Sequence, residues 1–167
     1  MTLQATHIIA AILIGMGATL VMDLWGYFQR KVMGIPPLNY CLVGRWLRHM
    51  PDGKFAHQSI LAAASKPGEC TVGWVAHYAI GVVFAGALLL ITSPGWIQQP
   101  TLAPALFVGL ATIAIPFLVM QPAFGLGIAA AKTPNPRRAR MLSLAAHTSF
   151  GLGLYLAALA FGPVLAR

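Results

Sequence analysis

The chain of 167 residues is 58% apolar and only 8% charged. An average soluble domain is about 25% charged, and a small domain keeps too much surface to bury so many apolar side chains. The composition therefore excludes a soluble globular enzyme. The net charge of +8 comes from 11 Lys and Arg against 3 Asp and Glu. The basic residues lie between apolar runs, where they indicate membrane topology rather than nucleic-acid binding.

Four apolar stretches are long enough to cross the hydrocarbon core of a bilayer, which takes about 20 helical residues. They run over 8–28, 72–92, 103–123 and 142–165, and the third can continue toward residue 131. The N-terminal stretch has no basic n-region, so a membrane span is predicted rather than a cleaved signal peptide. The predicted fold class is all-α, a polytopic membrane protein with four transmembrane helices in a bundle. Residues 1–167 are predicted to form a single domain.

The long segment between the first two spans is predicted to lie on the membrane surface. Residues 39–49 mix aromatic, apolar and basic side chains as an interfacial helix does. A second short helix is predicted at 57–64. Cys41 and Cys70 are distant in sequence and form no Cys-x-x-Cys motif, so neither a redox pair nor a zinc knuckle is predicted.

The basic residues also predict an orientation. Six of the 11 lie between the first and second spans and four between the third and fourth. The link at 93–100, between the second and third spans, has none. By the positive-inside rule the two basic loops are cytoplasmic. Both termini are therefore predicted to face the opposite side of the membrane.

Two sequence echoes suggest that a helical hairpin has been duplicated. Leu-Val-Met-Asp at 20–23 is echoed by Leu-Val-Met-Gln at 118–121, and Ala-His at 76–77, with a glycine four residues after the histidine, by the same pattern from 146. Half one would be 1–95 with a cytoplasmic insert at 32–70, and half two would be 103–167. Such a repeat would be parallel, because its first helices run in the same direction. Short matches in apolar sequence also arise by chance, so the duplication stays open.

The echoes place one polar side chain on each predicted span at a similar depth. Asp23, His77, Gln121 and His147 each lie seven to eleven residues from the nearest basic loop residue, or about 10–17 Å along a helix. A charge at such a depth costs several kcal/mol unless it is paired, so intramembrane ionisable residues are functional candidates. The structural alternative is that these groups only hydrogen-bond one helix to another.

Two kinds of cofactor suit these residues. The imidazoles and carboxylates that could hold a transition metal ion are those of Asp23, His57, Glu69, His77 and His147. His77 and His147 each lie four residues before a glycine, Gly81 and Gly151 respectively. These two histidines would suit the axial ligation of a haem b.

A polar pathway is also predicted, and the residues assigned to it are Gln121, Met22 and Met120. For the two methionines, contact with lipid or core is the competing interpretation. No Glu-x-x-His or Cys-x-x-Cys-His motif supports either cofactor, and no catalytic residue is assigned.

Several short motifs resemble a family of small bacterial inner-membrane proteins that is catalogued as a domain of unknown function. The motifs are Gly17-Ala18-Thr19, Met22-Asp23-Leu24-Trp25, Gly44-Arg45-Trp46, Gly73-Trp74 with His77-Tyr78, Met120-Gln121-Pro122 and Lys132-Thr133-Pro134. The resemblance covers nearly the whole chain. It implies a four-helix protein of the bacterial inner membrane, so both termini are predicted to be periplasmic. It brings no activity, cofactor or catalytic residue.

Three functions are compatible with these observations. The leading hypothesis is a buried Asp/His/Gln site that opens toward the cytoplasm and binds a metal ion or haem in a redox or metal-handling role. The alternative is a small proton- or cation-coupled transporter. The third is a non-catalytic accessory subunit, in which the small-residue helix faces pack against a membrane partner or a second copy. The lipid bilayer is the one partner predicted in all three, and whether the protein is an enzyme is left undecided.

Overall fold

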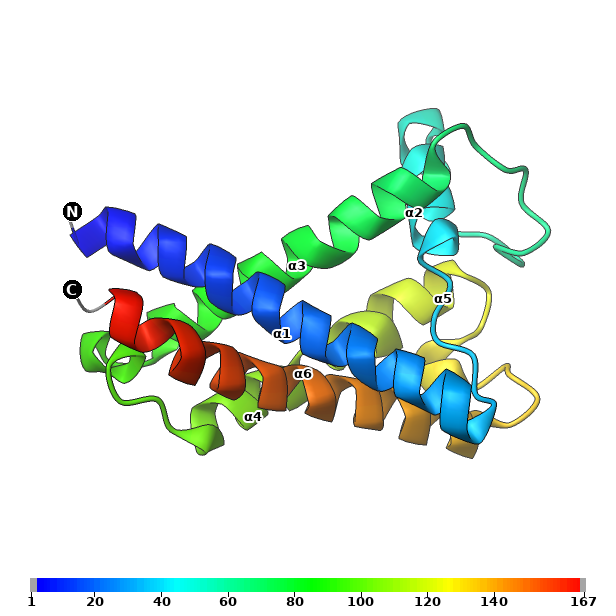
Figure 1. The fold of residues 1–167 in the computed structure, drawn as a ribbon. Helices are drawn as coiled ribbons and strands as arrows, with labels where there is room; N and C mark the ends of the chain where they lie inside the picture. The colour runs from blue at the N-terminus through cyan, green and yellow to red at the C-terminus, as the bar shows by residue number, and fades with distance from the viewer. Residues whose placement is uncertain (1–2, 166–167) are drawn as a thin grey trace. The chain divides into compact units, whose positions relative to one another are not determined.

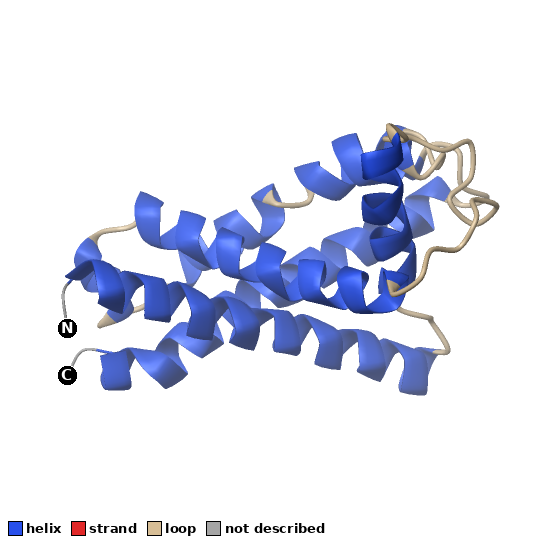
Figure 2. Ribbon diagram, turned by 90° about the horizontal axis from the view of Figure 1, so that it is seen from above, coloured by secondary structure: helices blue, strands red, loops and turns tan. Residues whose placement is uncertain are grey.

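A computed structural model describes residues 3–165, and within this range the chain is helical with no β-strand. The main helices are α1 (Leu3–Met33), α2 (Tyr40–His49), α3 (Glu69–Ile91), α4 (Leu102–Ala111), α5 (Gln121–Ala123) and α6 (Pro136–Leu165). Short helical turns are η1 (Met50–Asp52), η2 (Pro94–Ile97), η3 (Pro116–Met120) and η4 (Ile128–Ala130). Figure 1 shows their order along the chain, and Figure 2 shows that loops and turns join them.

Four helical segments are long and apolar enough to cross a membrane. They are Thr6–Met33, Glu69–Ile91, Leu102–Ala123 and Pro136–Pro163, and each overlaps one of the four predicted spans. The protein is therefore a multi-pass membrane protein surrounded by a lipid bilayer. The predicted helical membrane bundle agrees with this all-helical architecture.

Local signals in the sequence explain where the long helices begin and end. Helix α1 ends at Met33, and the next residue, Gly34, has a positive φ of 65° that turns the chain so that the Ile35 N–H donates to the Gln29 carbonyl at 3.2 Å. Helix α2 begins after Asn39, whose side chain accepts a hydrogen bond from the Cys41 N–H. Helix α6 begins with Pro136 in its first turn, after Asn135.

The third span is interrupted, as its prolines predict. Pro116 has no N–H to donate to the preceding turn, and η3 continues as a π-helix in which the Gln121 N–H bonds to the Pro116 carbonyl. Pro122 follows at once, and α5 ends at Ala123. The sequence predicts a bend here but not the π-helical turn.

The described chain forms two compact units. The first contains residues 1–37, 78–112 and 145–167, and the second contains 38–77 and 113–144. The first unit has an apolar core of small and branched side chains, among them Ala10, Ile14, Ala85, Leu88 and Leu154. Large apolar side chains such as Leu90 (87% exposed) lie on its outside, as expected where helices face lipid rather than water.

Glycines bring the helices of the first unit into backbone contact. A Cβ on Gly15 of α1 would lie 2.5 Å from Val82 Cα of α3, and a Cβ on Gly109 of α4 would lie 2.5 Å from Gly151 Cα of α6. Small residues at helix contacts are the usual means of close packing in membranes, where lipid removes the hydrophobic driving force between helices.

The second unit has a small apolar core of Val43, Ile60, Ala123 and Phe124. The loop after α2 is tied to the end of the third span, because the His57 N–H donates to the Ala123 carbonyl at 2.8 Å and the Ile60 N–H to the Phe124 carbonyl at 3.1 Å. The predicted helix at 39–49 is present as α2. The predicted helix at 57–64 is wrong, because these amide groups bond to another segment, and the chain forms turns there instead.

Candidate functional site

Asp23 and Tyr78 form a hydrogen-bonded pair between two membrane-spanning helices of the first unit. The Tyr78 hydroxyl of α3 donates to Asp23 Oδ2 of α1 at 2.9 Å. The two helices can approach closely because Gly81 has no Cβ, which would otherwise clash with Thr19 Oγ1. The Thr19 hydroxyl donates to the Gly15 carbonyl at 2.8 Å. A carboxylate inside a span therefore has a phenol as a direct partner.

His147 and Thr112 form a second such pair in the same unit. The His147 Nδ1 atom of α6 lies 2.9 Å from Thr112 Oγ1, directly after α4, and the Thr112 hydroxyl donates to the Gly109 carbonyl at 2.7 Å. Because a hydroxyl has one proton to donate, this chain of bonds assigns a proton to Nδ1. In the neutral imidazole the basic lone pair then lies on Nε2.

His77 belongs to an aromatic cluster of the second unit. Its ring stacks on Tyr40 with a centroid separation of 3.8 Å and meets the Trp74 ring edge-on at 5.9 Å. Tyr40 and Trp74 also contact each other at 4.8 Å. Two aromatic rings therefore pack against the His77 imidazole.

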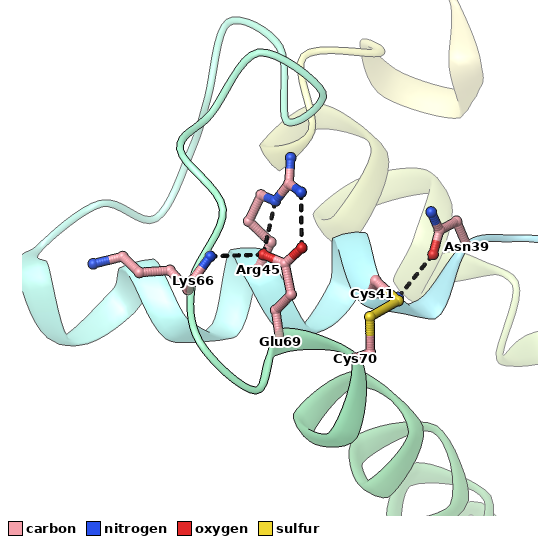
Figure 3. Close-up of a disulfide and its surroundings, with 6 residues drawn as sticks. All are labelled: Asn39, Cys41, Arg45, Lys66, Glu69 and Cys70. Carbon is pink, nitrogen blue, oxygen red and sulfur yellow. Dashed lines mark hydrogen bonds and ion pairs between the residues drawn. A yellow bond between two sulfur atoms is a disulfide. The ribbon is translucent and has the colours of Figure 1, made fainter.

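Glu69 is held by Arg45, which was not among the predicted site residues. Both of its carboxylate oxygens accept from Arg45, at 2.8 and 2.9 Å, and the Lys66 N–H also donates to it at 2.8 Å (Figure 3). This ion pair is largely buried, with side-chain exposures of 15% for Arg45 and 13% for Glu69, and the carboxylate raises the pKa of Arg45. Glu69 thus fixes the start of α3 to α2.

His57 lies beside His49 in the second unit, with ring centroids 5.0 Å apart. Its Nε2 atom is buried and has no hydrogen-bond partner among the described residues. Burial, followed by the nearby His49 and Lys54, lowers the pKa of His57 below its usual value. The surroundings of His57 therefore favour its neutral form.

The remaining predicted residues lie in helix contacts and apolar clusters. Met22 packs against the core of the first unit, and Met120 packs against that of the second. Gln121 is buried, and its Oε1 atom has no partner within the described chain. The Thr19 side chain occupies the space beside Gly81, and a Cβ on Gly151 would lie 3.1 Å from the Ala105 carbonyl oxygen. Both glycines therefore permit close helix contacts.

The predicted metal ligands are divided between the two units, with Asp23 and His147 in the first and His57, Glu69 and His77 in the second. Within residues 3–165, no group of three or more His, Cys, Asp or Glu side chains is arranged to hold a metal ion. Glu69 is already bonded to Arg45. A shared site of these residues stays a prediction.

The structure also contains a disulfide between Cys41 and Cys70, a pairing that the sequence analysis, which predicted neither a redox pair nor a zinc knuckle, did not include. The two cysteines are 29 residues apart, and the loop between them brings Cys70 back to α2. The pairing therefore cannot be predicted from a short sequence motif. A signal was nevertheless present: each cysteine opens the same Cys-x-Val-Gly pattern, ending at Gly44 and Gly73. Backbone atoms of α2 and α3 meet at these two glycines.

Comparison with known proteins identifies the family. Neither the curated proteins nor the solved structures give a match to the chain. A family model described as "Protein of unknown function (DUF2938)" matches residues 12–161, which is most of the sequence and includes all four candidate spans in whole or in large part. This agrees with the family resemblance seen in the sequence motifs. The chain therefore belongs to the DUF2938 family of proteins of unknown function.

Proposed function

We propose that this integral membrane protein is a small proton-coupled transporter whose proton-binding groups are Asp23 and His147. The observation that carries the proposal is the partner of each group, a hydroxyl from the neighbouring helix: Tyr78 for Asp23 and Thr112 for His147. A hydroxyl both donates and accepts hydrogen bonds. Each pair can therefore keep its hydrogen bond whether the titrating group holds a proton or has lost it.

This property distinguishes a proton carrier from a structural bridge. Arginine only donates, so a carboxylate bound to it is stable in the charged form alone. A carboxylate bound to a phenol accepts from the phenol when charged and can donate to it when protonated. Because an unsatisfied polar group inside a span costs several kcal/mol, keeping the bond in both states lowers the barrier to proton uptake and release.

A helix contact that recurs at aligned glycines, rather than the two pairs themselves, supports the duplicated hairpin. Gly81 of α3 packs on Gly15 and Thr19 of α1, and the residue that the sequence echo aligns with it, Gly151 of α6, packs on the α4 segment near Gly109. In both contacts a threonine hydroxyl donates to the carbonyl of the packing glycine, from Thr19 to Gly15 and from Thr112 to Gly109. A parallel repeat of this kind is a common architecture of transporters.

We infer the location and orientation from the basic residues and the family resemblance. With ten of the 11 Lys and Arg on the loops between spans one and two and between spans three and four, the positive-inside rule makes these loops cytoplasmic and both termini periplasmic. The membrane would be the bacterial inner membrane.

Proton flux into lipid vesicles tests the transport proposal. Purified protein is reconstituted with a pH-sensitive dye inside, and a potassium diffusion potential drives protons inward. Wild type is expected to raise the flux above that of empty vesicles, and Asp23→Asn to remove about 90% of the increase, because loss of a positioned proton-transfer group costs tenfold or more. Tyr78→Phe is expected to give a smaller loss, since the carboxyl group remains.

Asp52→Asn is the matched control, because Asp52 is a carboxylate of the loop after α2, outside the candidate spans. Its flux is expected to equal that of wild type. Equal fluxes from Asp23→Asn, His147→Gln and wild type would contradict the proposal. Metal and haem content of the same samples tests the cofactor hypothesis: a metal or haem that is bound by wild type and lost from His77→Ala and His147→Ala would favour it. Variants that only unfold would favour an accessory subunit.

A further inference from the structure

The Cys41–Cys70 disulfide joins the first turns of two helices. Cys41 is the second residue of α2 and Cys70 is the second residue of α3. The Cα atoms of the two cysteines lie 3.9 Å apart. Figure 3 shows the bridge beside the Arg45–Glu69 pair and Asn39. Partial positive charge at a helix N-terminus stabilises a thiolate. Both sulfurs therefore lie where the reduced, anionic form is favoured.

The two cysteine residues differ in exposure. Cys70 is exposed, whereas Cys41 is half-buried. An incoming thiolate must reach a sulfur along the axis of the S–S bond, so access decides which sulfur is attacked. Attack is expected at Cys70, which leaves Cys41 as the departing thiolate.

Other interactions besides the disulfide hold α2 and α3 together where they cross. A Cβ on Gly44 would lie 1.7 Å from the Glu69 carbonyl oxygen, and a Cβ on Gly73 would lie 1.9 Å from the Tyr40 carbonyl oxygen, so the two backbones are in direct contact. The Arg45–Glu69 ion pair spans the same crossing. Because these contacts do not depend on the S–S bond, the crossing can persist when the cysteines are reduced.

The predicted orientation gives this disulfide a particular meaning. The loop that carries Cys41 is one of the two basic loops, which the positive-inside rule places in the cytoplasm. Thiol systems keep cytosolic cysteines reduced, and the disulfides that do form there are mostly transient, catalytic or redox-sensing. A purely structural disulfide would be out of place on this face of the membrane.

We propose that Cys41 and Cys70 form a thiol–disulfide exchange site that accepts electrons from a dithiol reductant on the cytoplasmic face. The reductant's first thiolate attacks Cys70 Sγ, a mixed disulfide forms, and the Cys41–Cys70 bond breaks with Cys41 leaving as a thiolate that takes up a proton. The reductant's second thiol loses its proton to solvent, and the resulting thiolate attacks the reductant's first sulfur in the mixed disulfide. Cys70 leaves as a thiolate and takes up a proton. Two electrons pass from the dithiol, which becomes a disulfide, to the cysteine pair, which becomes two thiols.

Equilibration of the full-length protein with mixtures of reduced and oxidised glutathione tests the proposal. The free thiols are counted by the gel shift that a maleimide polymer produces. The pair is expected to pass reversibly from oxidised to reduced across the mixtures, without denaturant. The reduced protein is expected to keep its helical circular dichroism and the protease resistance of the loop at 54–68. A bond that is reduced only after unfolding, or a loop that is digested once the bond is reduced, would make the disulfide structural and overturn the proposal.

Single-cysteine variants test the order of attack. In Cys41→Ser the remaining Cys70 is expected to form a mixed disulfide with oxidised glutathione about tenfold faster than Cys41 does in Cys70→Ser. Reactivity follows thiolate character and exposure, and the two cysteines have equivalent helix positions but differ in exposure. Equal rates would contradict the assignment of Cys70 as the attacked sulfur.

Reporter fusions at Gln98 and at Arg138 test the compartment. We expect cytoplasmic activity at Arg138 and periplasmic activity at Gln98. The reverse result would place the disulfide in an oxidising compartment, where a permanent staple is ordinary, and would overturn the proposal together with the orientation.

Discussion

The two units of the chain hold their charged groups in opposite ways. In the first unit, Asp23 is bonded to the Tyr78 hydroxyl and His147 to the Thr112 hydroxyl. In the second unit, the carboxylate of Glu69 is bonded to a guanidinium, that of Arg45, through two short hydrogen bonds. A hydroxyl serves both protonation states of its partner, whereas a guanidinium serves only the charged one. The first arrangement suits proton exchange, and the second suits a permanent fastening.

The two units are also packed by different kinds of contact. The first unit is held largely by apolar side chains and by glycine contacts between long helices. The second unit has a core of four buried apolar residues and relies on polar side chains that reach backbone carbonyls. Examples are the bonds from Arg45 to Ala63, from Trp46 to Phe55 and between His49 and Ala64. A loop outside the lipid core is thus ordered by directional bonds that a spanning helix does not need.

The largest effect is predicted for Arg45→Ala. This change leaves the largely buried Glu69 carboxylate without its partner and removes the donor to the Ile60 and Ala63 carbonyls. We expect a loss of about 3 kcal/mol in the free energy of unfolding, in the range seen when one partner of a buried ion pair is deleted. Protease digestion of the loop at 54–68, followed against temperature, would measure it.

Arg48→Ala is the matched control for this prediction, because Arg48 lies on the same helix but is exposed. It is expected to change stability by less than about 0.5 kcal/mol. Arg45→Lys should recover only part of the loss, since an ammonium cannot make the bidentate contact. If Arg45→Ala and Arg48→Ala behaved alike, the second unit would not depend on its ion pair, and the contrast between the units would fail.

A smaller effect, in the first unit, is predicted for Gly15→Ala. The new Cβ would lie 2.5 Å from Val82 Cα and 2.7 Å from the Gly81 carbonyl oxygen, and backbone atoms cannot rotate away. Helices α1 and α3 would have to separate, which costs about 1–3 kcal/mol for overpacking of this kind. The thermal unfolding midpoint of the protein in detergent would report the change.

Gly86→Ala provides the control within the same helix pair. Its Cβ would have only the Ala11 Cβ as a neighbour, at an ordinary 3.9 Å. Replacing a helical glycine by alanine is then expected to stabilise the protein by about 0.5–1 kcal/mol. Opposite shifts from the two substitutions would establish that close approach, rather than glycine content, holds the first unit together. Shifts of the same sign would argue against it.

The spans and α2 could be predicted from the sequence, because apolar length and capping residues such as Asn39 act locally. The interruption of the third span followed from Pro116 and Pro122 for the same reason. The disulfide could not be predicted from spacing, since its pairing depends on how the loop returns to α2. The supposed helix at 57–64 failed because the amides of His57 and Ile60 bond to a segment more than 60 residues away in sequence.

The candidate site was predictable in part. Asp23 and His147 stood out because an ionisable group inside a span is unusual. Their partners Tyr78 and Thr112 did not, because tyrosine and threonine are common in membrane helices and their contacts depend on the register between helices. Glu69 was predicted as a ligand, but the sequence contained no sign that Arg45, 24 residues earlier, would reach it.

The smallest effect is predicted on acidification of the second unit. Burial, together with His49 and Lys54, lowers the pKa of His57 in the folded protein below its usual value. The unfolded chain therefore binds more protons at mildly acidic pH. The contribution of His57 to stability is complete above the unfolded-state pKa of about 6.5 and is lost as the pH falls through the lower pKa of the folded protein.

The hydrogen-exchange rate of residues 54–64, corrected for the intrinsic pH dependence, should therefore increase modestly when the pH is lowered from 7.5 to 5.5. His57→Gln should abolish the increase. Asp52 should not contribute in this window, because the hydrogen bond and charge of Lys66 lower its pKa, so its contribution is lost only at more acidic pH. An increase that survives in His57→Gln would assign the effect to another group and leave His57 a packing residue.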